Sequence, residues 1–488
     1  MGKRRSEHQP PSPQPCHDDG GGTKQKNVCY YYDPRISYVD YGETHEMVPH
    51  RVSMTLALIK AYGLLDDMDR LRVAPATEED LELAHDPEFI RFLRDLTPAD
   101  YNADAKTQRE AAEKYKLGEV WNELTHCVTN DNPVIENLWD YCQRYAGGSL
   151  AAARALASGR YKIAINWSGG MHHACKGKAG GFCYVNDIVV AIKALLDGGQ
   201  FNRVLYLDID AHHGDGVETA FMEDSRVLTV SFHQFGGEFF PRTGDAVDVG
   251  ELPAGDDGVC PTLINVPLQA GTRDGRYHQL FGPIVDRVMA VFEPDAIVMQ
   301  CGADSLAGDR LASLGLSVRG HAKCVSIVKG YGLPLLLLGG GGYTINHVAS
   351  CWCYETAVAI GKEIPDDIPQ HGYQNYYKSQ GYKLHYHKED SSSRKNRDMR
   401  SKDKITIDKV MNHLDRLSLE LMPKPRPSEQ LDEEPPRAPP PHTDDGDDAL
   451  VDRSPWDEDA VERLHQRCGE KMLHEFFTVL GRKHPKRI

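Results

Sequence analysis

The sequence predicts an α/β fold in which a mostly parallel β-sheet is covered by helices on both faces. Short apolar runs rich in Val, Ile and Leu alternate with longer helical patterns between about residue 28 and residue 368. This alternation is typical of strands joined by crossover helices. Several of the apolar runs also end directly in glycines, histidines or acidic residues. Buried parallel strands present polar groups in this way at their carboxyl ends.

The individual elements follow from hydrophobic periodicity and turn residues. Helical periodicity is present at 51–62, 146–157, 183–196 and 347–360. Apolar runs of strand length are present at 162–166, 203–207, 227–231, 296–300 and 333–338. Since parallel strands share one carboxyl edge, the loops after the first, second, fourth and fifth of these strands should converge on one crevice.

The chain divides into four segments by composition. Residues 1–26 are rich in Pro, Gly, Ser and charge and should form a disordered tail. Residues 27–378 carry the alternating pattern and should form the folded domain, whereas 379–453 are charged and then Pro-rich, as in a linker or tail. Residues 454–488 predict an amphipathic helix with a basic end, whose apolar stripe must be buried against its own domain or against a partner.

The composition excludes several classes of protein. The chain has 488 residues, 40% of them hydrophobic, so it can bury a large core. Its longest apolar run, 333–338, is far shorter than the roughly 18 residues that span a bilayer, so we expect no membrane insertion. The net charge of −16 argues against general affinity for nucleic-acid phosphates, so we expect no direct sequence-specific nucleic-acid binding, and it favours a cationic, Lys-rich partner. The 12 cysteines lack framework spacing, which favours a reducing compartment.

A candidate metal site follows the strand at 203–207. If the chain stays extended there, Asp210 and His212 point to the same side, because side chains alternate along a strand. With Asp304, which follows the strand at 296–300, they form a set of oxygen and nitrogen donors with open coordination positions, as a hydrolytic zinc requires. The alternative is that these buried groups only satisfy loop amides. The density of carboxylates and histidines between 208 and 215 favours a functional site.

Two adjacent histidines, His172 and His173, follow the strand at 162–166 and a Gly-Gly pair. A carboxylate on the distal nitrogen of each ring would fix its tautomer and raise its basicity, and Asp208 and Asp215 are the unassigned candidates. Tyr343 follows four glycines, which allow close backbone approach and could place its phenol near a developing oxyanion. The glycine run lacks the Gly-Lys-Ser/Thr sequence of a P-loop, which excludes a phosphate cradle.

Six motifs together resemble those of a zinc-dependent class I histone deacetylase, in the arginase/deacetylase superfamily. They are WSGGMHH (167–173), GFCYVND (181–187), DIDAHHGDGV (208–217), CGADSL (301–306), GHAKC (320–324) and GGGGYT (339–344). The resemblance implies an arginase-like three-layer fold with a central eight-stranded parallel sheet. It also implies hydrolysis of N-acetyl-lysine on histone tails, linked to transcriptional repression in the nucleus, with the cytoplasm as a second location.

The resemblance implies a role for each candidate residue. Asp210, His212 and Asp304 would hold one catalytic zinc ion. His173, oriented by Asp215, would act as general base and then protonate the leaving amine.

His172, backed by Asp208, would tune the charge beside this pair, and Tyr343 would stabilise the oxyanion. A narrow tube for the lysine stem would be lined by Gly181, Phe182, Phe240 and Leu311. Asp131 would bind the substrate backbone at the rim, and structural potassium ions would lie beside the strand that ends at Asp208.

The implied partners are acetylated histone tails and corepressor proteins in a multiprotein complex. Members of class I also hold an inositol phosphate in a basic pocket shared with the corepressor. Arg310 matches that pocket, but Val48 stands where the family has Lys and Asn346 where it has Arg. We therefore expect inositol phosphate binding to be weak.

Further departures lie near the rim. The segment 235–238 carries one extra residue, Arg242 stands at a usual Gly, and Glu46 replaces a usual Pro. These departures leave open the substrate preference and the placement of Phe240.

Three other functions stay open from the sequence. An acetylpolyamine amidohydrolase would share the fold and the site, and an arginase-like hydrolase would hold two manganese ions. A catalytically silent scaffold would bind corepressor proteins only. The complete set of candidate site residues argues against the scaffold, and Tyr343 with the His172-His173 pair fits the manganese enzyme poorly.

Overall fold

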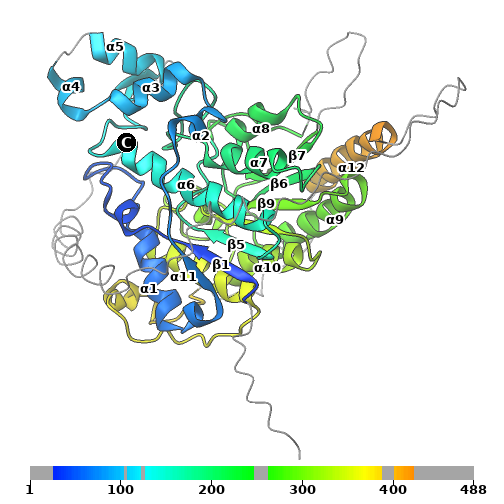
Figure 1. Cartoon of the computed structure of the whole chain (residues 1–488). Helices are drawn as coiled ribbons and strands as arrows, with labels where there is room; N and C mark the ends of the chain where they lie inside the picture. Colours follow the sequence, from blue (N-terminus) through cyan, green and yellow to red (C-terminus); the bar gives the residue numbers. More distant parts are fainter. Residues whose placement is uncertain (1–25, 104–106, 123–126, 247–261, 387–400, 422–488) are drawn as a thin grey trace, which may run out of the picture.

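The computed structural model describes residues 26–103, 107–122, 127–246, 262–386 and 401–421. It contains one parallel eight-stranded sheet with the strand order β2-β1-β5-β10-β9-β6-β7-β8 (Figure 1). The strands are β1 Val28–Tyr31, β2 Asp69–Leu71, β5 Ile163–Asn166, β6 Val204–Asp208, β7 Val227–Gln234, β8 Leu263–Leu268, β9 Ala296–Gln300 and β10 Leu335–Leu338. The predicted α/β class and the eight-stranded parallel sheet are confirmed.

Helices cover both faces of the sheet. One face carries α1 Arg51–Ala61, α9 Asp274–Phe292, α10 Val318–Lys329 and α11 Ile345–Ile360, and the other carries α6 Leu138–Ala157, α7 Asp187–Asp197 and α8 Asp215–Phe221. Alternate strand residues serve the two cores: Leu205 and Leu207 of β6 belong to one, and Val204 and Tyr206 to the other. Buried parallel strands are apolar on both faces for this reason.

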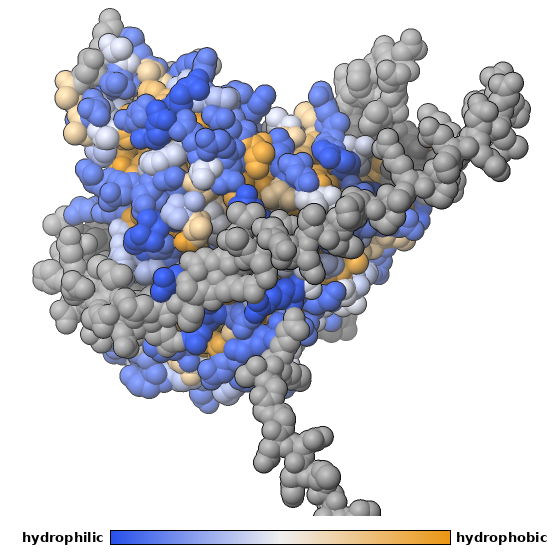
Figure 2. Space-filling model, in the orientation of Figure 1, coloured by the Kyte–Doolittle hydropathy of each residue, from blue (hydrophilic) through white to orange (hydrophobic). Residues whose placement is uncertain are grey.

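Several small elements lie between β2 and α6. They are the helices α2 Glu78–Glu82, α3 Pro87–Asp95, α4 Pro98–Ala103 and α5 Thr107–Lys114, and the antiparallel hairpin of β3 Val120–Asn122 and β4 Cys127–Thr129. In Figure 1, helices α3, α4 and α5 project from one end of the molecule. The face shown in Figure 2 is mostly hydrophilic with small, separate hydrophobic patches. Within the described ranges no helix combines the length and apolarity needed to cross a membrane.

The pattern-based predictions differ from the structure in identifiable places. The helix predicted at 183–196 begins at Asp187, because the Asn186 side chain accepts a hydrogen bond from Val189 N and caps it. The helix predicted at 146–157 begins at Leu138. Strands β1, β2 and β8 were not predicted individually: β1 lies at the apolar start of the folded domain, β2 is very short, and β8 contains Pro267, which an edge strand tolerates.

The segment 379–453, which we expected to be a linker or tail, contains helix α12 Ser401–Leu421. This helix packs against α9 and β8, and it lies beside α9 in Figure 1. Its Asp403 forms a buried ion pair of 2.7 Å with Arg276 of α9, and Val410, Leu414 and Leu417 are buried. The high charge of the segment concealed this apolar stripe. Residues 1–25 and the predicted helix at 454–488 lie outside the described residues.

Candidate active site

The candidate site lies at the carboxyl ends of the four central strands, β5, β10, β9 and β6. The last residues of these strands are in register: Leu338 pairs with both Asn166 and Gln300, and Gln300 pairs with Asp208. The loops that follow therefore start at the same height on one edge of the sheet. This register brings the four predicted clusters together, as parallel strands are expected to do.

Asp210, His212 and Asp304 form a buried cluster in which the candidate ligand atoms lie within 4.8 Å of one another. The Nδ1 atom of His212 lies 2.9 Å from Oδ2 of Asp304 and 3.2 Å from Oδ1 of Asp210. Burial and the nearby Asp210 carboxylate raise the pKa of Asp304 to about 7. A divalent cation would remove the repulsion between the Asp210 and Asp304 carboxylates. Two carboxylates with one imidazole are donors that suit zinc.

Surrounding groups fix the orientation of these three side chains. The Oδ2 atom of Asp210 accepts hydrogen bonds of 2.8 Å from Gln300 Nε2 and from the backbone of Gly341. The Oδ1 atom of Asp304 accepts a 2.7 Å bond from the backbone N–H of Ala211. The His212 ring stacks on Phe239 at 4.8 Å. Asp210 Oδ1 and Asp304 Oδ2 are therefore the oxygens left facing His212 Nδ1.

The two adjacent histidines each have their own carboxylate. His172 Nδ1 lies 2.8 Å from Asp208 Oδ2, and His173 Nδ1 lies 2.7 Å from Asp215 Oδ1, so both Nδ1 atoms donate. Burial alone would lower the pKa of His172, but Asp208 and Asp210 raise it to about 9. Burial and the neighbouring His172 lower the pKa of His173 to about 4. His173 is thus neutral at neutral pH, with Nε2 available to accept a proton.

The glycine run after β10 places Tyr343 beside this group. Gly340 and Gly342 have φ values of +145° and +128°, which favour glycine. The buried guanidinium of Arg51 donates to the carbonyl oxygens of both glycines at 2.5 Å. The backbone N–H of Tyr343 donates to Asp309 at 2.8 Å. Burial raises the pKa of Tyr343 well above its usual value, so its phenol stays protonated and can donate a hydrogen bond.

The predicted tube residues lie around the approach to His173. The Phe240 ring packs edge-on against His173 at 4.9 Å, and the Phe182 ring packs edge-on against Tyr343 at 5.7 Å. Gly181 has φ +50°, and a Cβ there would lie 2.4 Å from the His173 ring. Leu311 is exposed on a separate loop, joined to the site through Asp309, which accepts hydrogen bonds from the backbones of both Leu311 and Tyr343.

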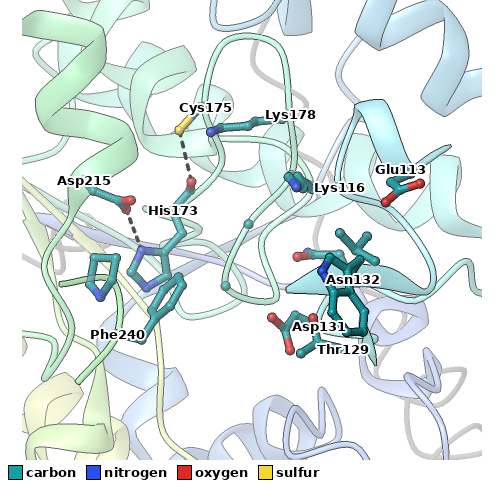
Figure 3. Close-up of a pocket in the computed structure, with 16 residues that line it drawn as sticks. Glu113, Lys116, Thr129, Asp131, Asn132, His173, Cys175, Lys178, Asp215 and Phe240 are labelled. Atoms are coloured by element: carbon teal, nitrogen blue, oxygen red, sulfur yellow. Dashed lines mark hydrogen bonds and ion pairs between the residues drawn. The ribbon is translucent and has the colours of Figure 1, made fainter. Parts of the chain in front are cut away.

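A recess of about 520 Å³ extends from His173 and Phe240 toward the β3–β4 hairpin. Figure 3 shows Asp131, Thr129 and Asn132 on the side opposite His173 and Phe240. Phe240 lines this recess despite the extra residue at 235–238. Arg242, at the usual glycine position, has φ +74°, the left-handed conformation that glycine adopts most readily.

Several residues of the site were missed by the sequence analysis. Gln300 and Phe239 contact the ligand cluster, and each lies within a few residues of a predicted position, which is the signal that could have found them. His45 packs against Phe182 at 4.6 Å, and its Nε2 lies 3.1 Å from the backbone oxygen of Asp131. Arg51 gives no local signal, because it reaches the glycine run from a distant helix.

Comparison with known proteins agrees with this arrangement. Residues 45–359 match the histone deacetylase domain family. The chain is 48% identical to Histone deacetylase 19 of Arabidopsis thaliana over 378 residues, which cover 78% of this chain and 70% of that protein. It is 44% identical to Histone deacetylase 2 of Oryza sativa subsp. japonica over 483 residues, 96% of this chain and 88% of that protein.

A vertebrate relative shows a similar likeness. Histone deacetylase 1 of Bos taurus is 47% identical over 364 residues, which cover 75% of this chain and 70% of that protein. The family match includes every candidate metal and catalytic residue and most of the described sheet. The chain therefore belongs to the histone deacetylase family.

Proposed function

We propose that this protein hydrolyses N-acetyl-lysine in histone tails to lysine and acetate, in the nucleus, as part of a corepressor complex that represses transcription. One observation carries the proposal. The buried Asp210-His212-Asp304 cluster lies beside two His–Asp pairs, and His173 of one pair lines a recess together with Gly181 and Phe240. This arrangement supplies a metal site, proton transfer and a slot for a long side chain.

Asp210, His212 and Asp304 would hold the zinc ion. Zinc bound there supplies a Lewis acid that polarises the acetyl carbonyl and makes water a better nucleophile. His173 accepts the proton of the attacking water at Nε2, while Asp215 holds Nδ1–H and stabilises the imidazolium that forms. The same nitrogen then returns the proton to the leaving amine. His172, held by Asp208, carries positive charge beside the reacting group.

We also propose that structural potassium ions bind beside β6. This part of the proposal rests on the family resemblance alone. They would not take part in proton transfer. Potassium analysis of the purified enzyme, together with its thermal stability in potassium and in sodium, tests this part separately from catalysis.

Release of acetate from an acetylated histone peptide tests the function. Purified protein should release acetate, and a zinc chelator should abolish the release. Preference for acetylated spermidine over the peptide would favour the polyamine enzyme, and two manganese ions per chain would favour the arginase-like enzyme. No release with either substrate from zinc-loaded protein would favour the scaffold.

Tyr343→Phe should keep the fold and the zinc but lower kcat roughly 10²- to 10³-fold. The phenol is the proposed donor to the oxyanion, and one such donor typically contributes an effect of this size. Steady-state kinetics with matched zinc content measures it. The ring that remains in this variant would keep the packing on Phe182, so an unchanged kcat would remove the hydroxyl from the mechanism.

We further infer that the enzyme is insensitive to inositol phosphates. Val48 and Asn346 lack the positive charge that the family has at these two positions. The one matching cation, Arg310, is already paired with Glu46 at 3.0 Å. Asn346 donates instead to Gln380 at 2.8 Å. Each missing charge-assisted contact removes roughly 1.5 to 3 kcal/mol, so binding should fall by orders of magnitude.

Titration of inositol tetrakisphosphate against the enzyme in its corepressor complex tests this inference. The unmutated enzyme should not respond, and Val48→Lys with Asn346→Arg should gain a response. Val48→Gln with Asn346→Gln is the matched control without charge. Strong activation of the unmutated enzyme at low micromolar concentration would contradict the inference.

The β3–β4 hairpin is the proposed contact for substrate residues beside the acetyl-lysine. Trp121 is 49% exposed, lines the recess that also contains Asp131 and His173, and has Glu113 in the same lining. An exposed indole favours the basic side chains of a histone tail through cation–π contact.

Trp121→Ala should raise KM for a long acetylated histone peptide roughly two- to fivefold, the effect of an exposed cation–π contact of about 0.5 to 1 kcal/mol. KM for acetyl-lysine without flanking residues should not change. Val128→Ala is the matched control, because Val128 pairs directly with Trp121 and is exposed but does not line the recess. Equal effects on both substrates would exclude a contact with the flanking residues.

A further inference from the structure

A second group of buried side chains lies behind the candidate metal site. His321 of α10 and Glu355 of α11 are fully buried, and His321 Nδ1 lies 2.5 Å from Glu355 Oε1. Cys351 completes the group, with its ligand atom within 4.8 Å of the others. The other carboxyl oxygen of Glu355 makes no hydrogen bond within the described part of the chain. A buried ionisable pair of this kind is costly, so its position calls for an explanation.

The pair is joined to the metal site through one backbone carbonyl. His321 Nε2 donates a hydrogen bond of 2.9 Å to the oxygen of Gly302. Gly302 lies two residues before Asp304, and it also touches Asp210: a Cβ on Gly302 would lie 1.9 Å from Asp210 Oδ2. A shift of Gly302 would therefore move both carboxylates of the candidate metal site.

The loop that contains Gly302 is held at each polar backbone atom. Cys301 N donates to Leu338 O at 2.9 Å, and Cys301 O accepts from Trp352 Nε1 at 2.8 Å. Gly302 N donates to Gln300 Oε1 at 2.7 Å, and Ala303 N donates to Gly341 O at 2.9 Å. The carbonyl oxygen of Gly302 accepts the bond of 2.9 Å from His321 Nε2 and a longer bond of 3.4 Å from the Ser305 hydroxyl, so His321 is its nearer donor.

Binding of a metal ion by His321, Cys351 and Glu355 fits the geometry less well. Both ring nitrogens of His321 are already engaged, one by Glu355 and the other by Gly302. Burial raises the pKa of the Cys351 thiol to about 11, so it is not a ready thiolate ligand. The group is better suited to hold the loop than to hold a second ion.

We propose that His321, clamped by Glu355, is a positioning residue that sets the affinity of the Asp210-His212-Asp304 site for zinc through Gly302. The inference rests on the proposed function only in taking zinc as the ion held there. Glu355 fixes the ring and its Nδ1–H, as carboxylates do behind metal-binding histidines. Here the ring acts on the backbone of the loop that presents a ligand.

Two double variants test the proposal without leaving an unpaired buried charge. His321→Leu with Glu355→Leu removes both the pair and the bond to Gly302. His321→Gln with Glu355→Leu removes the pair but keeps an amide donor that reaches Gly302 O. The zinc dissociation constant and dissociation rate are measured by competition with a chromogenic chelator, and folding by thermal unfolding of the metal-free proteins.

The Leu/Leu variant should bind zinc roughly 10- to 100-fold more weakly, the range typical of groups behind metal ligands. The Gln/Leu variant should stay within about threefold of the unmutated enzyme, as expected if the Gly302 bond is what matters. Unchanged affinity in a folded Leu/Leu variant, or equal losses in both variants, would overturn the proposal. Two zinc ions per unmutated chain, with one lost on Glu355 substitution, would also overturn it.

Arg276→Leu with Asp403→Leu is the matched control, because it removes a buried ion pair that joins α9 to α12 instead of α10 to α11. It should lower thermal stability and leave zinc affinity unchanged. Should the Leu/Leu variant not fold, His321→Asn and His321→Gln are compared on a Glu355→Gln background. The shorter Asn amide does not reach Gly302, so only it should weaken zinc binding. If the unmutated protein binds no zinc, the proposed function and this inference both fail, whereas unchanged zinc affinity in the Leu/Leu variant overturns this inference alone.

Discussion

His173→Ala is expected to lower kcat by at least roughly 10²- to 10⁴-fold, the contribution of a general acid–base group. His173 is buried, its Nδ1 is occupied by Asp215, and its low pKa keeps Nε2 free of a proton at neutral pH. Its ring packs against Phe240 and His172 but is not among the candidate metal ligands. The variant should therefore retain zinc and lose the proton transfer.

Activity measurement at matched zinc content checks this expectation. Asp215→Asn is the companion variant: it keeps the shape of the partner but removes the charge that stabilises the imidazolium. It should lose less activity than His173→Ala. Full activity in the alanine variant would contradict the assignment of His173, whatever happens at Asp215.

Much of the fold was predictable because parallel strands have a simple signature. The runs at 203–207 and 296–300 are apolar on both faces, as β6 and β9 require, and their ends carry the polar clusters. The edge strand β2 has only one paired neighbour, and its three residues are too few to show the apolar pattern by which a strand is detected. Helix α12 was not predicted because charged residues interrupt its apolar stripe. Its buried Asp403 also pairs with Arg276, which is far away in the sequence.

The site was predictable to the extent that its residues follow strand ends. Asp210, His212 and Asp304 needed only the inference that β6 and β9 end at one edge, and the structure places β9 directly beside β6. The pairing of His172 with Asp208 and of His173 with Asp215 depends on side-chain geometry, so the residues alone left it open. Arg51 has no signal in its own helix, and the GHAKC motif at 320–324 does not by itself show what His321 contacts. Only the assembled fold brings them to the site.

Asp304→Ala is expected to lose both zinc and activity. Its loss of affinity should exceed the roughly 10- to 100-fold typical of groups behind the ligands, because the variant removes one of the ligands themselves. Zinc content is measured by elemental analysis after dialysis, and acetate release is measured on the same sample. Stoichiometric zinc in this variant would show that Asp304 is not the third ligand.

Alanine alone does not separate loss of a ligand from loss of local structure, because Asp304 Oδ1 also accepts the hydrogen bond of Ala211 N. Asp304→Asn makes the separation. Its side-chain oxygen can keep the Ala211 bond, but it offers no anion to the metal. If Asp304 is a ligand, Asn should lose zinc nearly as severely as Ala while unfolding at a temperature closer to that of the unmutated chain. If Asp304 only supports the loop, Asn should restore zinc binding. The two substitutions therefore distinguish a ligand from a structural carboxylate in the same assay.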